Sequence, residues 1–273
     1  MPANPYKLLV IDIDGTLVGK KGKISPEDSG ALSSAADAGI KVSLSTGRSL
    51  QSSLGIINQL SLNGYHITFD GALVSDQTGS DEVYVKPVRP EVVRQAVDFA
   101  HATSVAIDFY SATQYFIERE TRASEIQRNY YGIQPIFTDF TGLWQKERII
   151  KGGMVTTSPA EVARAREFQD KFRDRLHFSW VQTPAYPEVH FINVVARGVS
   201  KAEALPALAS HLKIELSEVV AIGDGTNDIS ILTQAGLAVA MGNAPPEVKA
   251  VADYVTLDVD HSGLAAAVKK LLG

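Results

Sequence analysis

The chain has 273 residues, and its 26 Lys and Arg against 31 Asp and Glu give a formal net charge of −5. That balance excludes the basic surface of an ordinary nucleic-acid-binding module. With 45% hydrophobic and 21% charged residues, the composition is that of a folded chain. The length suggests about two domains. There is no cysteine, which excludes disulfides, thiol nucleophiles and Cys-ligated metal centres.

The N-terminal residues 1–7 lack a basic region followed by an apolar stretch, so the sequence predicts no secretion signal. No segment approaches the roughly 18 apolar residues that are needed to span a bilayer. We therefore expect a cytoplasmic protein without membrane or nucleic-acid partners, which exists as a monomer or a small homo-oligomer.

Both terminal parts of the chain alternate short apolar runs with segments of helical length. The runs that predict strands buried on both faces are residues 8–13, 40–44, 67–69, 219–222 and 237–240. Helices are predicted for residues 26–38, 50–60, 201–211 and 229–235. This alternation predicts an α/β fold with a Rossmann-like, doubly wound parallel sheet that is covered by helices on both faces.

The middle of the chain follows another order. Its predicted elements are a helix at 91–103, strands at 105–110 and 115–118, a further helix, a strand at 149–156, a helix at 159–175, and antiparallel strands at 176–183 and 188–195. Pro87 and Pro90 mark the start of this region, and Arg197 and Gly198 mark its end. We predict an α+β domain of residues 87–196, inserted as a cap into a core of residues 1–86 and 197–273.

Two acidic motifs directly follow predicted strands: Asp12-Ile13-Asp14-Gly15-Thr16 and Gly223-Asp224-Gly225-Thr226-Asn227-Asp228. Carboxylates at buried strand ends are costly unless a metal or hydrogen-bond donors compensate them. Because ligands of open α/β sheets bind outside the carboxyl ends of the strands, we expect four carboxylates to converge there. They belong to Asp12, Asp14, Asp224 and Asp228. An oxygen-only set favours Mg²⁺ over Zn²⁺, whereas a solvated Asp-Gly turn is the alternative for the first motif alone.

Two further segments point to the same edge of the sheet. Ser45-Thr46-Gly47-Arg48 follows the strand at 40–44 and opens a helix, which makes an anion site if Thr46 is more than an N-cap. Lys201 lies in the first turn of its helix, after Ser200 as N-cap, with Glu203 at capping-box spacing. A cation there opposes the helix dipole, so we expect it to neutralise a phosphate or a carboxylate, the alternative being a solvated surface lysine.

Together these residues resemble the haloacid dehalogenase (HAD) superfamily, and within it the Cof-like phosphatases with a type II cap of the C2B subtype. The four signature motifs occur in order as Asp12-Ile13-Asp14-Gly15-Thr16, Thr46-Gly47-Arg48, Lys201 and Gly223-Asp224-Gly225-Thr226-Asn227-Asp228. Met241-Gly242-Asn243-Ala244 also resembles a family element. The match covers both halves of the core, whereas the cap matches in size and element order.

The resemblance implies a role for each residue. Asp12 is the implied nucleophile, which forms an aspartyl-phosphate, and Asp14 is the implied general acid and then base. Mg²⁺ would be bound by the Asp12 carboxylate, the Asp14 carbonyl and Asp224, with Asp228 in support. The implied phosphate-binding residues are Thr46, Gly47, Arg48, Lys201, Asn227 and Asn243.

Some positions are less clearly assigned. The family usually has Asn-Gly-Ala after the third strand, but this chain has Asp70-Gly71-Ala72, so Asp70 either adds a charge beside an anion site or simply makes a turn. In the cap, Tyr186, Glu188 and His190 are candidates to face the substrate, with ordinary packing as the alternative.

The sequence therefore predicts a Mg²⁺-dependent phosphomonoesterase that acts on small phosphorylated metabolites, sugar phosphates first among them. One alternative is a sugar phosphomutase or phosphotransferase, in which the aspartyl-phosphate passes its phosphoryl group to a sugar. The other is a signalling or binding protein that is phosphorylated on Asp12 and turns over slowly. In the second case a stable aspartyl-phosphate would accumulate without release of phosphate.

Overall fold

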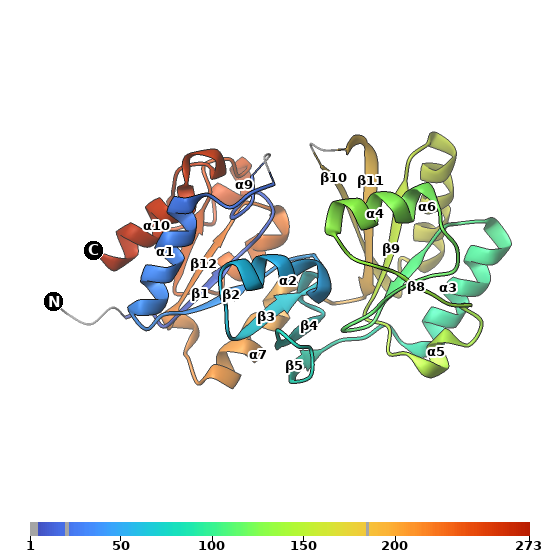
Figure 1. Ribbon diagram of the computed structural model, residues 1–273, viewed down its shortest axis with the longest axis horizontal. Coiled ribbons are helices and arrows are strands. Elements are labelled where there is room, and N and C mark those ends of the chain that lie inside the picture. Colours follow the sequence, from blue (N-terminus) through green and yellow to red (C-terminus); the bar gives the residue numbers. More distant parts are fainter. Residues whose placement is uncertain (1–4, 20–21, 184–185) are drawn as a thin grey trace. The chain divides into compact units, whose positions relative to one another are not determined.

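The computed structural model describes residues 5–19, 22–183 and 186–273, and the chain divides into two compact units (Figure 1). The first unit is Met1–Gly47, Leu54–Tyr84 and Ser200–Gly273, and the second is Arg48–Ser53 and Val85–Val199. The predicted core and cap differ from these units by a few residues at each junction. They differ also at Arg48–Ser53, which group with the second unit.

The first unit contains a five-stranded parallel sheet in the order β14-β13-β12-β1-β2. Its strands are β1 (Leu8–Ile11), β2 (Lys41–Leu44), β12 (Val219–Gly223), β13 (Leu237–Ala240) and β14 (Tyr254–Val255). All residues of β1 and β12 are buried, because a strand inside a sheet that is covered on both faces meets only other side chains. The predicted parallel α/β core is confirmed.

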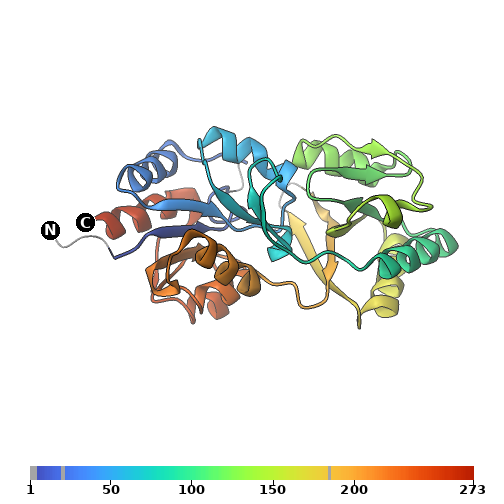
Figure 2. The same cartoon turned by 90° about the horizontal axis from the view of Figure 1, so that it is seen from below.

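Helices cover both faces of this sheet (Figures 1 and 2). α1 (Pro26–Asp37) and α10 (Gly263–Leu272) lie together on one face, and α7 (Lys201–Leu212) lies on the other. α7 packs Ala204, Leu205 and Leu208 into a cluster that includes Leu8 and Val219. The remaining helices are α2 (Leu50–Gln59), α8 (Ile229–Leu232) and α9 (Pro246–Lys249). No helix of the described residues is long and apolar enough to cross a membrane.

The third predicted strand takes a different place from the one expected. β3 (Tyr65–Thr68) meets the parallel sheet through one isolated bridge between Ser45 and Ile67. It pairs in antiparallel fashion with β4 (Leu73–Asp76), in a small sheet that also contains β5 (Glu82–Val85). The chain reverses at Phe69–Gly71, because this short turn returns it as an antiparallel neighbour before a crossover helix can form.

The second unit is built on a six-stranded sheet in the order β10-β11-β9-β6-β7-β8. Its strands are β6 (Asp108–Tyr110), β7 (Tyr115–Ile117), β8 (Ile136–Phe137), β9 (Lys151–Thr156), β10 (Leu176–Thr183) and β11 (Tyr186–Ala196). All neighbours pair in antiparallel fashion except β7 and β8. The second unit is therefore a mixed α+β structure, as predicted.

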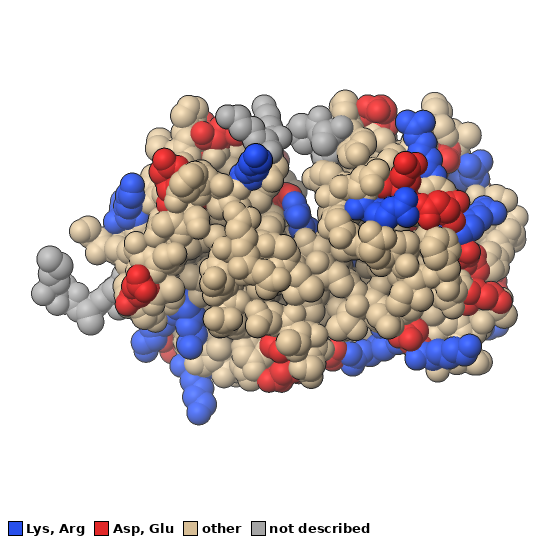
Figure 3. Space-filling model, viewed as in Figure 1, with Lys and Arg blue, Asp and Glu red and all other residues tan. Residues whose placement is uncertain are grey.

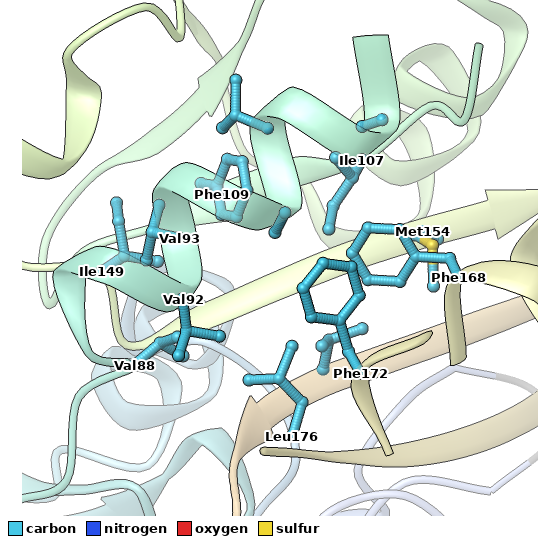
Figure 4. Close-up of a cluster of buried hydrophobic side chains, with 14 of the residues drawn as sticks. Val88, Val92, Val93, Ile107, Phe109, Ile149, Met154, Phe168, Phe172 and Leu176 are labelled. Carbon is cyan, nitrogen blue, oxygen red and sulfur yellow. The ribbon is translucent and has the colours of Figure 1, made fainter. Parts of the chain in front are cut away.

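Helices pack on both faces of this sheet as well. α3 (Pro90–Thr103), α5 (Leu143–Lys146) and α6 (Pro159–Phe172) contribute to one hydrophobic cluster with Phe109, Met154 and Ile192 (Figure 4). α4 (Arg122–Tyr131) contributes Ile126 to a second cluster with Val155 and Phe191. Successive residues of β9 and β11 thus belong to different clusters, because side chains alternate between the faces of a sheet.

The three cap residues that are candidates to face the substrate share one parity along β11, but the pairing of β10 with β11 shifts register between Val181 and Thr183, next to Tyr186. His190 has the parity of Ile192, whose side chain lies in the cluster of α3 and α6, and its ring lies 5.6 Å from that of Trp180. The ring of Tyr186 instead packs with that of Phe191, on the side of α4. Glu188 is exposed. Tyr186 and His190 therefore lie on different faces of the sheet, and which of the three candidates faces a substrate stays a prediction.

Charged side chains of both signs are mixed over the face that Figure 3 shows. Lys and Arg lie among Asp and Glu there, which agrees with the formal net charge of −5. Because both signs are mixed, the described residues of that face form no extended positive patch of the kind that attracts nucleic acid.

Candidate active site

The candidate residues follow the carboxyl ends of four adjacent parallel strands. Asp12 comes directly after β1, and Asp224 directly after β12. Ser45 and Thr46 follow β2, and Asn243 lies three residues beyond the end of β13. Because these strands run parallel in the order β13-β12-β1-β2, their ends lie along one edge of the sheet.

Lys201 is the centre of this group. Its side chain is 1% exposed, and Nζ donates to Asp12 Oδ1 at 2.8 Å, Asp228 Oδ1 at 2.6 Å and the Ser45 carbonyl at 2.8 Å. An ammonium group has three hydrogens, so these three acceptors use all of them. Burial acts to lower the pKa of Lys201, but the charges of Asp12 and Asp228 outweigh it and hold the pKa above its usual value. Lys201 is therefore a buried, charged group and not a solvated surface lysine.

The start of the Lys201 helix differs from the capping box that was predicted. Ser200 is the N-cap residue, but its side chain makes no capping hydrogen bond. Glu203 accepts a hydrogen bond from the Tyr84 hydroxyl at 2.9 Å. The spacing alone suggested a local partner, whereas the fold brings a tyrosine from β5 to the same carboxylate.

Three of the four predicted carboxylates come together as a group that can hold a metal ion. One oxygen each of Asp12, Asp224 and Asp228 lies within 4.8 Å of the others. Burial and the charge of Asp228 raise the pKa of Asp12 well above its usual value, although Lys201 acts to lower it. Burial and Asp228 also raise the pKa of Asp224, to about 6. Crowded carboxylates of this kind are stabilised by a cation, and oxygen ligands alone suit a hard one.

Asp228 has a different place in this group from that of Asp12 and Asp224. Its Oδ1 accepts from Lys201, and its Oδ2 accepts from the backbone N–H groups of Asp224 and Gly225 at 3.1 and 2.9 Å. The side chain is fully buried. Asp228 thus orients Lys201 and the loop that carries Asp224, which agrees with a supporting place in the metal site. Asp14 is exposed, and its charge contributes to the raised pKa of Asp224.

Two neutral side chains hold the Asp224 carboxylate. Thr16 donates from Oγ1 to Asp224 Oδ1 at 3.1 Å, and Asn243 donates from Nδ2 to Asp224 Oδ2 at 3.1 Å. Asn243 Nδ2 also donates to the Gly15 carbonyl at 2.8 Å, and its Oδ1 accepts from the Val259 N–H. In the structure Asn243 orients a candidate metal ligand, and its binding of phosphate stays a prediction. Thr16 was given no role, although its place in the first acidic motif was a signal for one.

Gly15 lets the loops that carry Asp14 and Asp224 approach each other closely. Its φ is +95°, and a Cβ at this position would lie 2.2 Å from Asp224 Oδ2. An alanine would therefore have to push the Asp224 carboxylate away as well as adopt an unfavourable backbone conformation.

We accordingly expect Gly15→Ala to weaken binding of Mg²⁺ by about 10- to 100-fold, the usual effect of disturbing the support of a metal ligand. Calorimetric titration with Mg²⁺ measures this directly. Gly39→Ala is the matched control, since Gly39 also has a positive φ, +83°, but no atom within 4 Å of the added Cβ. Both variants carry the backbone cost, so equal Mg²⁺ affinity in the two would refute the role of the close approach.

The remaining predicted phosphate-binding residues lie at two places. Thr46 is 1% exposed, and its N–H donates to the Ile67 carbonyl at 2.9 Å. Gly47 and Asn227 both lie beside Asp70: Asn227 Nδ2 donates to Asp70 Oδ1 at 3.3 Å, and a Cβ on Gly47 would lie 2.8 Å from the same oxygen. Arg48 groups with the second unit, where its guanidinium lies 5.9 Å from the centre of the Tyr131 ring.

Comparison with known proteins assigns the family. The sequence matches the haloacid dehalogenase-like hydrolases over residues 9–268, so the chain belongs to that family. It is 28% identical to the phosphatase YwpJ of Bacillus subtilis, over 97% of this chain and all of that one. It is also 28% identical to an HMP-PP phosphatase of Yersinia pseudotuberculosis, over 89% of this chain and 86% of that one.

Solved structures agree with this assignment. A haloacid dehalogenase-like hydrolase from Bacteroides thetaiotaomicron superimposes with a TM-score of 0.85 at 27% identity, covering 97% of this chain and 99% of the other. A sugar phosphatase of subclass IIB of the superfamily gives a TM-score of 0.77 at 28% identity, covering 97% and 98%. The chain is thus an enzyme of the HAD phosphatase type, as its motifs predicted.

Proposed function

We propose that this protein is a Mg²⁺-dependent phosphomonoesterase that hydrolyses small phosphorylated metabolites through an aspartyl-phosphate on Asp12. The observation that carries the proposal is the contact of Lys201 Nζ with Asp12 Oδ1 at 2.8 Å, next to the carboxylate of Asp224. A buried carboxylate that is held by a cation and lies beside a candidate metal site is suited to attack an anionic phosphoryl group.

The reaction has two displacements at phosphorus. The Asp12 carboxylate attacks phosphorus, the bond to the leaving alcohol breaks, and Asp14 gives its proton to the alcohol oxygen. Asp14, now ionised, takes a proton from water as that water attacks the phosphorus of the aspartyl-phosphate. This step releases inorganic phosphate and restores Asp12 and the proton on Asp14. The exposure of Asp14 is compatible with exchange of protons with substrate and water.

The other site residues bind the phosphoryl group or orient the side chains that act on it. Lys201 places positive charge at the attacking carboxylate, and the segment of Thr46 and Gly47 follows the end of β2 beside it, where we propose that it contacts the phosphoryl oxygens. Asn227 lies beside Gly47 at the shared contact with Asp70. Asn243 acts through Asp224, which it orients.

The donor set fits a hard divalent cation. Asp12, Asp224 and the Asp14 carbonyl would hold it, while Asp228, whose oxygens already accept hydrogen bonds, would support the site. A bound Mg²⁺ neutralises charge on the phosphoryl oxygens and on the crowded carboxylates. The raised pKa values of Asp12 and Asp224 support this fit, because they show how strongly the group resists carrying its full negative charge alone.

The proposed substrate class is based on the named relatives and on the presence of an inserted domain. One relative is named an HMP-PP phosphatase, and one solved neighbour is a subclass IIB sugar phosphatase. We propose sugar phosphates as the first class to test, and we propose that the second unit is a type II cap of the C2B subtype. The mixed sheet of this unit, with helices on both faces, is compatible with such a cap.

The test is release of p-nitrophenol and inorganic phosphate from p-nitrophenyl phosphate. We expect turnover with Mg²⁺, loss of turnover with excess chelator, and recovery when Mg²⁺ is restored, because the crowded carboxylates need a cation before they can receive a phosphoryl group. Screening of sugar phosphates follows.

Each alternative activity leaves its own product. A sugar product that carries the phosphoryl group, with no phosphate released, would show a phosphotransferase. Stable labelling of Asp12 without turnover would show a slowly cycling phosphoprotein.

A further inference from the structure

The turn at Phe69–Gly71 has an unusual backbone that three separate elements hold in place. Phe69, Asp70 and Gly71 all have positive φ, at 54°, 56° and 97°. Bulky residues such as Phe seldom adopt this region, so the surrounding structure must impose it. Phe69 is fully buried, and Asp70 N–H donates to the Thr46 carbonyl at 3.0 Å. The turn is thereby tied to the segment that follows β2.

Gly71 brings the same turn against the start of α7. A Cβ on Gly71 would lie 2.3 Å from the Ser200 carbonyl oxygen and 2.8 Å from the Lys201 nitrogen. Only glycine allows an approach this close. The backbone of the turn thus packs directly on the residue that orients the proposed nucleophile.

The Asp70 side chain makes the third contact. Its Oδ1 accepts from Asn227 Nδ2 at 3.3 Å, and it lies where a Gly47 Cβ would approach to 2.8 Å. One carboxylate oxygen therefore lies against both Gly47 and Asn227, which come from separate loops after β2 and β12.

We propose that Asp70 is a positioning residue for the phosphate end of the substrate, which acts by holding Asn227 against the Thr46–Gly47 segment. This inference rests on the proposed phosphatase function. The feature of Asp70 that matters is an acceptor oxygen in a left-handed backbone position, and its negative charge is not required. Asparagine tolerates that backbone region and offers the same acceptor.

Two variants separate the acceptor from the backbone. Asp70→Gly keeps the left-handed conformation without strain but removes the acceptor, and we expect it to raise KM for p-nitrophenyl phosphate and Ki for inorganic phosphate about tenfold, the effect of one lost hydrogen bond. Asp70→Asn retains the acceptor, so we expect it to restore both constants to within about threefold of the parent.

Further variants show whether the effect passes through Asn227. Asn227→Ala should be at least as impaired as Asp70→Gly, and the double variant should be no worse than Asn227→Ala alone, because Asp70 acts through Asn227. Asp76→Gly is the control: Asp76 accepts backbone N–H groups of Ser80 and Asp81 in another turn of the same unit, so its loss should leave KM and Ki unchanged. Melting temperatures of all variants show whether they fold.

Failure of the proposed phosphatase function and failure of the positioning role of Asp70 give different results. If the parent enzyme releases no phosphate from any phosphomonoester, the proposed function fails before Asp70 is tested. If the parent is active, the positioning role is overturned by an Asp70→Gly enzyme with parental KM and Ki. It is equally overturned by additive effects in the double variant, or by an Asp70→Asn enzyme as impaired as Asp70→Gly.

Discussion

Lys201→Met is expected to lower phosphatase activity by at least about 10²- to 10³-fold, the effect of removing one preorganised donor from a transition state. The same substitution is expected to destabilise the fold by about 3–5 kcal/mol, because it leaves buried carboxylates without their cation. Lys201 Nζ contacts both Asp12 and Asp228, and neither carboxylate is well exposed. Methionine has a similar length and no charge, so the change isolates the ammonium group.

The stability loss should depend on pH in a defined direction. Lys201 lowers the pKa of Asp12, so its removal raises that pKa further above its value in the unfolded chain. A carboxyl whose pKa is raised by folding binds more protons in the folded state, and stability then falls as pH rises through the interval between the two pKa values. Denaturant unfolding of the parent and Lys201→Met proteins at several pH values measures this, and we expect the deficit to be smallest in acid.

The double variant Lys201→Met/Asp228→Asn is the matched control. It removes one buried anion together with the cation, while the asparagine oxygen can still accept from the N–H groups of Asp224 and Gly225. We expect it to regain part of the lost stability and none of the activity. A Lys201→Met protein as stable as the parent would contradict the view that Lys201 compensates buried charge.

Asp12→Asn is expected to abolish turnover without harm to the fold. An amide cannot accept the phosphoryl group, so no aspartyl-phosphate forms and hydrolysis falls to background. Burial and the charge of Asp228 already raise the pKa of Asp12, which means that its ionised form is costly in the folded state. A neutral side chain should therefore leave the melting temperature equal to that of the parent or higher.

Asp14→Asn distinguishes the acid–base role from the nucleophile. With p-nitrophenyl phosphate, the leaving group departs without a proton, so Asp12 can still be phosphorylated, but the base for the attacking water is missing. We expect about 10²- to 10⁴-fold slower turnover and accumulation of the phosphoenzyme, seen by acid quenching after brief exposure to labelled substrate. The assignment of the two roles would be contradicted if Asp12→Asn protein became labelled. It would also be contradicted if Asp14→Asn protein accumulated no label with this substrate.

The core of the fold and the place of the site were predictable from local patterns. A strand that is buried on both faces must be apolar throughout, so the runs at residues 8–13 and 219–222 marked two strands, which the structure shows as the adjacent β1 and β12. Acidic residues directly after such runs stood out because burial makes them costly there. The sheet topology then brought Asp12, Asp224 and Asp228 together, as their positions after strands predicted.

Other features depend on which distant segments meet, and local patterns predicted these poorly. The spacing of Ser200 and Glu203 suggested a capping box, but Tyr84 competes for the same carboxylate from 119 residues away. The strand predicted at 67–69 is β3 (Tyr65–Thr68), which pairs outside the parallel sheet because a left-handed turn at Phe69–Gly71 reverses the chain. The alternation of side chains along β11 could be read from the sequence. Which helices cover the face of the sheet that carries His190 was decided by packing of distant segments.

The sequence by itself determined the class of fold, the family and the acidic edge of the sheet, because hydrophobic periodicity and polar residues at strand ends are local properties of the chain. Only the tertiary structure decided that Lys201 is buried between Asp12, 189 residues away, and Asp228. It also decided that Asn243 orients Asp224 and that Asp70 contacts Asn227. A buried polar side chain must find its partners within the fold, and packing of remote elements selects which partners are within reach.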